Sequence, residues 1–372
     1  MTAIPLVDVK AAYLRHQDAI DAAIRDVVES TAFIQGPQLR AFEEAFAAFC
    51  GTTHAIGVGS GTAALHLALA AVGVGPGDEV AVPAHSFIAT IEPVSWLGAR
   101  PRFVEIDPLT GALDPAALKG AIDGVKAVLP VHIHGRPADL EQIGAIAADA
   151  GVPVIEDAAQ AHGAEIVRAD GTVVRAGGYG LAGCFSFYPG KNLGAFGDAG
   201  AITTNDDAFA ATVRRLRDHG RTTKYEHEII GYAHRMDTLQ AAVLHAKLST
   251  LDADNQRRAA LTADYEAALS GVGDLWFPPA TPTRRSVFHH ALLRTPRRDA
   301  LLAHLKERGI GAGIHYPVPL HLQPAYAFLG HRRGDFPATE AWADECLSLP
   351  LYPELTAAQH TAVVAGVTSF YS

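Results

Sequence analysis

The chain has 372 residues, of which 49% are hydrophobic and 19% charged, with a formal net charge of −10. This length suggests about two domains, and the acidic balance argues against a surface for nucleic acids or anionic membranes. Cys50, Cys184 and Cys346 are too few and too widely spaced for a disulfide framework or a zinc site. With no signal-peptide pattern and no apolar run of membrane-spanning length, we expect a cytoplasmic protein.

The first 50 residues carry two helical patterns. Apolar residues recur at helical spacing over 10–30, Gly36-Pro37 interrupts the pattern, and a second helix is predicted over 38–50.

Between residues 54 and 205, short apolar runs alternate with helical segments. The runs cover 55–59, 78–83, 101–107, 126–132, 152–157, 184–188 and 199–204, and helices are predicted over 61–72, 87–97, 115–122 and 138–150. This alternation is typical of an α/β fold with a mostly parallel sheet between helices. Such sheets bind ligands at the carboxyl ends of their strands, so motifs at the ends of the runs are candidate site residues.

The pattern changes again after residue 237. A long helix is predicted over 237–269 and a strand over 287–294, followed by helices over 297–308, 339–347 and 356–370. We therefore predict two domains. Residues 1–245 form a large α/β domain that includes the N-terminal helical segment, and residues 246–372 form a small α+β domain.

Two motifs follow the first two runs. The sequence Gly-Ser-Gly-Thr at 59–62 joins a strand to a helix, and exposed N–H groups at a helix N-terminus favour an anion such as phosphate. The structural alternative is a simple N-cap by Ser60 or Thr62. Phe87 lies just past the second run, where it is either a core residue or a plate for an aromatic ligand.

Two further motifs follow later runs. Asp157 ends the run 152–157, and Gln160 comes three residues later. A buried carboxylate needs a cationic partner, which a protonated pyridine nitrogen would supply. Ser186 and Lys191 lie in FSFYPGKN; a lone lysine in a turn is usually solvated, but one in an apolar pocket can form a Schiff base. Together these motifs supply the parts of a pyridoxal phosphate (PLP) site.

The chain resembles the DegT/DnrJ/EryC1/StrS family of PLP-dependent sugar aminotransferases, which share the aspartate aminotransferase fold (fold type I). The likeness runs almost end to end. It rests on SGTAALHLAL, GDEVAVPAHSFIAT, PVHIHGRPADL, VIEDAAQAHGA, CFSFYPGKNLGAFGDAGAITTN, RMDTLQAAVL and GIHYPVPLHLQPAY. The resemblance implies a large domain with a mostly parallel seven-stranded sheet between helices and a smaller C-terminal α+β domain.

The resemblance also implies a role for each matching residue. Lys191 would be the catalytic residue that holds PLP covalently, Asp157 would pair with the pyridine nitrogen, and Gln160 would contact the ring hydroxyl. The other implied cofactor contacts are Phe87 on the ring and Gly61, Thr62 and Ser186 on the phosphate. The implied substrate contacts are Arg235, His315 and Tyr316.

Members of the family are homodimers with shared active sites, and the segment 231–237 matches the loop that the neighbouring subunit contributes. Ala233 departs from the pattern, because the family usually has an asparagine there that reaches the partner's cofactor phosphate. That contact is lost, made by water, or replaced by a neighbour such as His234. The segment 166–180 is longer than usual, and its Asp170-Gly171 pair predicts an extra hairpin.

The implied reaction moves an amino group from an amino acid, by family habit glutamate, to a keto sugar. A nucleotide-linked 3-keto hexose is favoured over a 4-keto one. The alternatives are a keto-cyclitol aminotransferase, a PLP-dependent dehydratase, or a regulatory relative on the same fold. Dehydratases that carry histidine at the lysine position are disfavoured by Lys191, and a nicotinamide oxidoreductase by the lack of G-x-G-x-x-G. The histidine pairs lack carboxylates at ligand spacing, so no metal site is predicted.

Overall fold

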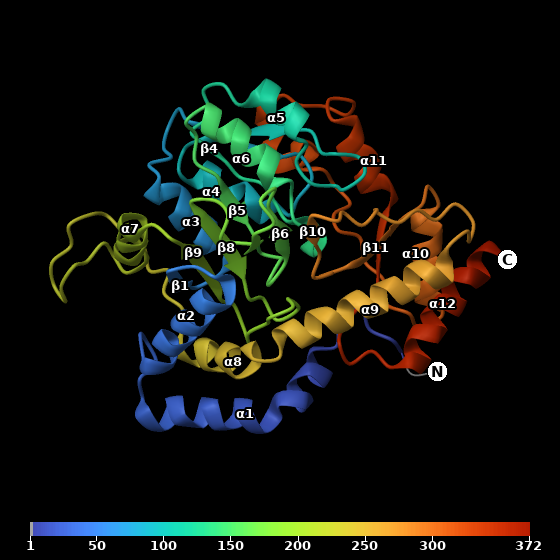
Figure 1. Cartoon of the computed structure of the whole chain (residues 1–372), viewed down its shortest axis with the longest axis horizontal. Coiled ribbons are helices and arrows are strands. Elements are labelled where there is room, and N and C mark those ends of the chain that lie inside the picture. The colour runs from blue at the N-terminus through green and yellow to red at the C-terminus, as the bar shows by residue number, and fades with distance from the viewer. Residues whose placement is uncertain (1–2) are drawn as a thin grey trace.

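A seven-stranded sheet forms the centre of the computed structural model, which describes residues 3–372 (Figure 1). Its order is β1-β9-β8-β5-β4-β2-β3, and the bridges Val128–Val154 and Val131–Asp157 join its two halves. Within this sheet only β9 runs antiparallel to its neighbours, so the predicted fold class is confirmed. The strands are β1 (His54–Val58), β2 (Glu79–Pro83), β3 (Arg100–Val104), β4 (Ala127–Val128), β5 (Ile155–Asp157), β8 (Ala182–Ser186) and β9 (Gly200–Thr204).

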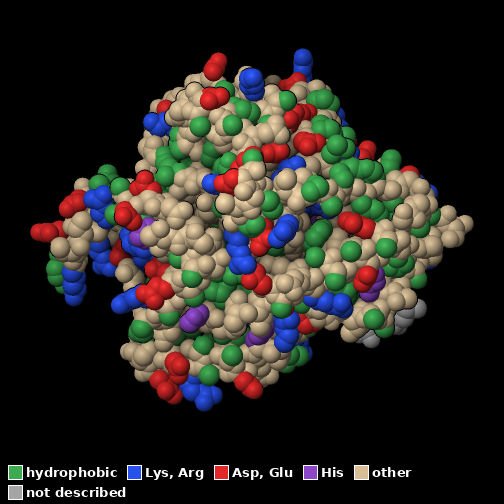
Figure 2. Space-filling view, in the orientation of Figure 1, with side chains coloured by type: hydrophobic (Ala, Val, Ile, Leu, Met, Phe, Trp, Pro, Cys, Tyr) green, Lys and Arg blue, Asp and Glu red, His purple; other side chains and the backbone are tan. Residues whose placement is uncertain are grey.

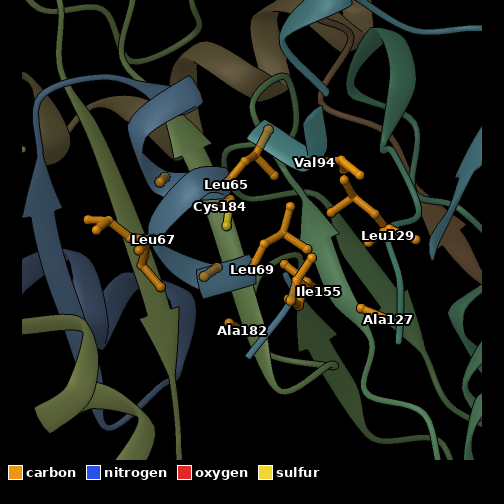
Figure 3. Packing of buried hydrophobic residues seen from close by; sticks show 14 of the residues in the cluster. Leu65, Leu67, Leu69, Val94, Ala127, Leu129, Ile155, Ala182 and Cys184 are labelled. Carbon is orange, nitrogen blue, oxygen red and sulfur yellow. The ribbon is translucent and has the colours of Figure 1, made fainter. Parts of the chain in front are cut away.

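Helices cover both faces of the sheet, as the alternating apolar runs predict. On one face, Leu65 and Leu69 of α3 pack toward Cys184 and Ile155 of the strands (Figure 3). The other helices on this face are α4 (Glu92–Trp96) and α7 (Asp207–Arg217), beside α3 (Gly61–Ala71). The opposite face is covered by α2 (Pro37–Cys50), α5 (Pro115–Ala121), α6 (Leu140–Asp149) and α8 (Thr238–Leu248).

The helix predicted over 237–269 is in fact two helices, because α8 ends at Leu248 and α9 spans Leu251–Leu269. The hydroxyl of Thr250 donates to the carbonyl oxygen of Lys247, a local side-chain bond that competes with the helical pattern. Helix α1 (Val9–Ser30) lies beside α8, and α9 leads from there toward the C-terminal part of the chain (Figure 1).

The C-terminal part has its own hydrophobic core, formed by α9, α10 (Arg298–Glu307), α12 (Ala357–Tyr371) and the antiparallel pair β11 (Ala291–Arg294) and β12 (Cys346–Leu349). Helix α11 (Pro337–Glu345) precedes β12. The predicted strand over 287–294 is shorter than expected, because Phe288 has a positive φ of 46° that a strand does not accommodate. The division into domains at residue 245 stays a prediction.

The hairpin predicted within 166–180 is present. Strands β6 (Glu165–Val167) and β7 (Val173–Arg175) pair antiparallel, and β10 (Arg284–Arg285) adds a third strand to β6. Gly171 has a φ of 83°, the conformation that the Asp-Gly turn requires.

The segment that follows α7 projects from the body of the molecule (Figure 1), and Figure 2 shows basic and acidic side chains mixed on this projection. In the part of the chain that the structure describes, no helix combines the length and the hydrophobicity that crossing a bilayer requires.

Candidate active site

A cavity of about 480 Å³ lies at the carboxyl ends of the central strands. The segments after β1, β2, β5 and β8 all contribute to its wall, as expected for a parallel sheet. Nine of the predicted site residues line it: Gly61, Thr62, Phe87, Asp157, Gln160, Ser186, Lys191, His315 and Tyr316. Motifs separated by more than 250 residues in sequence are therefore brought into one site.

One end of the cavity is built to accept an anion. Ser60 caps α3 by accepting the N–H of Ala63 at 3.0 Å, and the first N–H groups of a helix have no partner within it. A Cβ atom on Gly61 would lie 2.6 Å from the Cβ of Ser186, so only glycine allows the helix to start this close to β8. Helix dipole, N–H groups and the Ser186 hydroxyl together fit a phosphate group.

Asp157 is a buried carboxylate with donors on both oxygens. Its Oδ2 accepts the Thr90 hydroxyl at 2.8 Å and its Oδ1 accepts the Ala159 N–H at 3.2 Å. Burial raises the pKa of Asp157, while these two hydrogen bonds and the charge of Lys191 act to lower it. The donors thus compensate for part of the desolvation of a carboxylate that faces the cavity.

Lys191 enters the cavity from a tight turn after β8. Its N–H donates to the carbonyl oxygen of Tyr188 at 2.8 Å, which closes the turn Tyr188-Pro189-Gly190-Lys191. Burial lowers the pKa of Lys191 to about 8, and the charge of Asp157 acts in the opposite direction. A lysine with such a pKa has a sizeable fraction of free amine near neutral pH, which makes it a better nucleophile and base than a solvated lysine.

Gln160 forms hydrogen bonds both to the segment after β4 and to the C-terminal part of the chain. Its Oε1 accepts the N–H of His134 at 2.6 Å, and its Nε2 donates to the hydroxyl of Tyr316 at 3.0 Å. The ring of Tyr316 in turn lies 5.3 Å from the ring of Phe87, centroid to centroid. Phe87 is 52% exposed and lines the cavity, so its ring is accessible to a ligand.

His315 lines the cavity together with two other histidines, His289 and His290. Its Nδ1 lies 2.9 Å from the Ser348 hydroxyl, and its ring stacks on that of His290 at 3.8 Å. Burial lowers the pKa of His315 to about 4, with the charge of Lys191 as a second cause. The ring is therefore neutral at neutral pH and can exchange hydrogen bonds with hydroxyl groups of a substrate.

Arg235 does not line the cavity of its own chain. Its guanidinium pairs with Asp218, Nη1 to Oδ1 at 2.5 Å, so the predicted substrate contact stays a prediction. The His234 ring, one possible replacement for the asparagine absent at Ala233, is engaged within its own chain. It stacks on Tyr232, and its Nε2 lies 3.2 Å from Nδ1 of His66.

Several residues of the site do not stand out in the sequence. Thr90 is part of VPAHSFIAT, but only the 3₁₀ turn η1 (Ile88–Thr90), where a continuous helix is predicted, brings its hydroxyl to Asp157. His289 and His290 attract attention only as metal ligands, yet both line the cavity. Ser86, Tyr188 and Asp198 also line the cavity.

Glu156 precedes Asp157 but is turned away from the cavity. One oxygen accepts the Nε2–H of His132 at 2.9 Å and the N–H of Gly177 at 2.7 Å, and the other accepts N–H groups of Tyr179 and Gly180. The Ala138 N–H donates to Nδ1 of His132, which places the ring proton on Nε2. Glu156 therefore anchors the loop that leads into β8.

We predict that Glu156→Gln lowers the free energy of unfolding by about 3 kcal/mol, because it breaks a buried charged network. Cofactor binding and turnover at low temperature should be retained. Denaturant unfolding measures the first effect and steady-state kinetics the second. Loss of turnover in a variant that unfolds like the wild type would show that Glu156 takes part in the chemistry.

The chain is similar to known proteins over almost its whole length. Residues 15–368 match the DegT/DnrJ/EryC1/StrS aminotransferase family. The dTDP-3-amino-3,4,6-trideoxy-alpha-D-glucose transaminase of Streptomyces venezuelae is 46% identical over 98% of this chain and 95% of its own. The erythromycin biosynthesis sensory transduction protein EryC1 of Saccharopolyspora erythraea is 48% identical over 96% and 97%. The crystal structure of S. venezuelae DesV with a ketimine intermediate has a TM-score of 0.96, with 44% identity over 100% and 99%.

These matches span almost the whole chain, and they accompany a site whose residues fit the cofactor of the family. The chain belongs to the DegT/DnrJ/EryC1/StrS aminotransferase family and is a PLP-dependent sugar aminotransferase of fold type I.

Proposed function

We propose that this enzyme aminates carbon 3 of a keto sugar carried on a nucleoside diphosphate, with glutamate as the amino donor. The observation that carries the proposal is the cavity that gathers Lys191, Asp157 and the anion-binding start of α3. The choice of carbon 3 and of a nucleotide-linked sugar is supported by the S. venezuelae relative, which is named for a dTDP-3-amino sugar.

The cavity residues have the donor set that PLP needs. Gly61, Thr62 and Ser186 would hold the phosphate, and Asp157 would hold the protonated ring nitrogen. Gln160 would contact the ring hydroxyl and Phe87 would cover one face of the ring. When bound, the cofactor supplies an aldehyde for the amino group and a ring that accepts electrons from the substrate.

Lys191 holds and moves protons in this proposal. With its pKa near 8, it can accept a proton from the substrate carbon and return it later, and it also provides the amine that holds the cofactor. Asp157 keeps the ring nitrogen protonated by remaining ionised beside it. His315 and Tyr316 also line the cavity, where they would orient the sugar.

We also propose a homodimer in a reducing, cytoplasmic environment. Large hydrophobic side chains are exposed around the α1–α2 connection, including Phe33 at 43% and Ile34 at 50%, and such surfaces mark protein contacts. Arg235 and its loop would then contribute to the neighbouring subunit's site. The three cysteines are free and buried, which suits a reducing compartment.

The proposed substrate is tested with a panel of matched 3-keto and 4-keto nucleotide sugars, a keto-cyclitol, and the same sugars without nucleotide. We expect glutamate-dependent amination of a 3-keto nucleotide sugar, identified by mass spectrometry of the amino sugar. Amination of only the 4-keto sugars or of only the cyclitol would contradict the proposal.

A further inference from the structure

Two buried hydroxyl groups, those of Ser86 and Thr90, are linked in series by hydrogen bonds to Asp157. The Oγ of Ser86 lies 2.7 Å from the Oγ1 of Thr90, and this Oγ1 lies 2.8 Å from the Oδ2 of Asp157. Their exposures are 3%, 1% and 5%, so only a small part of each side chain reaches the cavity. The turn that holds them is closed by the N–H of Thr90, which donates to the carbonyl oxygen of Phe87 at 3.0 Å.

The donor and acceptor roles in these two hydrogen bonds depend on the charge of the carboxyl group. A hydroxyl group has a single proton to donate, and an ionised carboxylate can only accept. When Asp157 is ionised, Thr90 donates to it and must accept the proton of Ser86, so both short contacts are satisfied in one direction. The Thr90 hydroxyl thus donates a hydrogen bond to the ionised carboxylate of Asp157. Such charge-assisted hydrogen bonds are stronger than neutral ones.

We propose that Thr90 is a positioning residue that, with Ser86 behind it, keeps Asp157 ionised and oriented toward the cofactor's ring nitrogen. The inference deepens the proposed function and rests on the role of Asp157 in it. The need for such a residue follows from burial, which by itself favours the neutral carboxyl group. Thr90 makes no contact with the substrate in this account and acts only through Asp157.

The titratable groups facing Asp157 define what a pH profile would report. Lys191 and Tyr316 line the same cavity, His132 lies on the segment after β4, and Cys184 lies on β8. Burial raises the pKa values of Cys184 and Tyr316, so both are neutral through the neutral range. The free amine of Lys191, with its pKa of about 8, titrates on the basic side in the apoenzyme. His315, with its pKa of about 4, also titrates on the acidic side, but its imidazole bonds to Ser348 and not to Thr90 or Ser86. A shift confined to the acidic side would therefore report on Asp157 when only its hydroxyl partner is changed.

The test compares Thr90→Val, which removes the hydroxyl at constant shape, with Thr90→Ser, which keeps it. PLP dissociation constants of the apoenzyme and kcat/KM are measured across pH. Removing the donor raises the pKa of Asp157, so the ionised form is lost at a higher pH as pH falls. We expect Thr90→Val to weaken PLP binding and lower kcat/KM about tenfold each and to move the acidic limb to higher pH. Thr90→Ser should behave like the wild type.

Two further variants separate the possible failures. Ser86→Ala should also move the acidic limb to higher pH, by a smaller amount than Thr90→Val does. If Thr90→Val does not fold, the shift in Ser86→Ala tests the proposal instead. Asp157→Asn serves as the reference for the proposed function, with no acidic limb from this carboxyl. If Asp157→Asn matters and the acidic limbs of Thr90→Val and Ser86→Ala match the wild type, the inference is wrong. If Asp157→Asn itself behaves like the wild type, the role of Asp157 and the inference both fail.

Discussion

Replacing Lys191 with alanine is expected to lower transamination by about four orders of magnitude or more while leaving the protein folded. The amine is the group in the cavity that can both hold the cofactor and move the substrate proton, and loss of such a group removes several catalytic contributions at once. The side chain borders the cavity, so its truncation opens little of the core. Steady-state kinetics with glutamate and circular dichroism measure the two outcomes.

Lys247 provides the matched control for this experiment. Burial lowers its pKa to about 8 as well, but its Nζ donates to the carbonyl oxygen of Gly194 and it lines a separate hollow beside Phe196. Lys247→Met should therefore keep the cofactor's visible absorbance and most of the turnover. Wild-type turnover by Lys191→Ala would refute the assignment of the catalytic lysine.

The second large effect is expected from Asp157→Asn. The amide has nearly the same shape but no charge, so it cannot stabilise a protonated ring nitrogen in a buried site. We expect kcat to fall by about 10²- to 10³-fold, which corresponds to a loss of about 3 to 4 kcal/mol of transition-state stabilisation. Stopped-flow measurements with glutamate alone would show the slower amino transfer to the cofactor.

Glu156→Gln is the control for Asp157→Asn, because the two carboxylates are adjacent and both are buried. We expect opposite effects of the two substitutions. Asp157→Asn should lower kcat with a small effect on the free energy of unfolding. Glu156→Gln should lower the free energy of unfolding with a small effect on kcat. The reverse pattern would mean that the roles of the two carboxylates have been exchanged.

The sequence was sufficient for the architecture and for most of the cavity. Buried parallel strands are apolar runs, and a ligand site at their carboxyl ends places Asp157 and Lys191 at the ends of such runs. The hairpin around Gly171 was also predictable, because an Asp-Gly pair strongly favours a tight turn between two strands. In each case a local pattern and the tertiary structure require the same residues.

The remaining features depend on contacts that no local pattern encodes. Where the predicted helix is interrupted, the backbone N–H and the hydroxyl of Thr250 both donate to the carbonyl oxygen of Lys247, and neither glycine nor proline marks the position. The hydrogen bond from Thr90 to Asp157 joins residues 67 positions apart. Arg235 could not be placed from its motif either, because its partner Asp218 lies on a different segment. Such pairings arise only once the chain has folded.

Chemical trapping can show whether Lys191 is the residue that holds the cofactor. Borohydride reduction of the PLP-loaded enzyme fixes the cofactor's aldehyde carbon to the amine that it has joined, and peptide mass spectrometry then locates the modified lysine. We expect a single modification on Lys191, absent from Lys191→Ala and retained in Lys247→Met. A modification on Lys247, or a loaded enzyme with no trapped lysine, would contradict it.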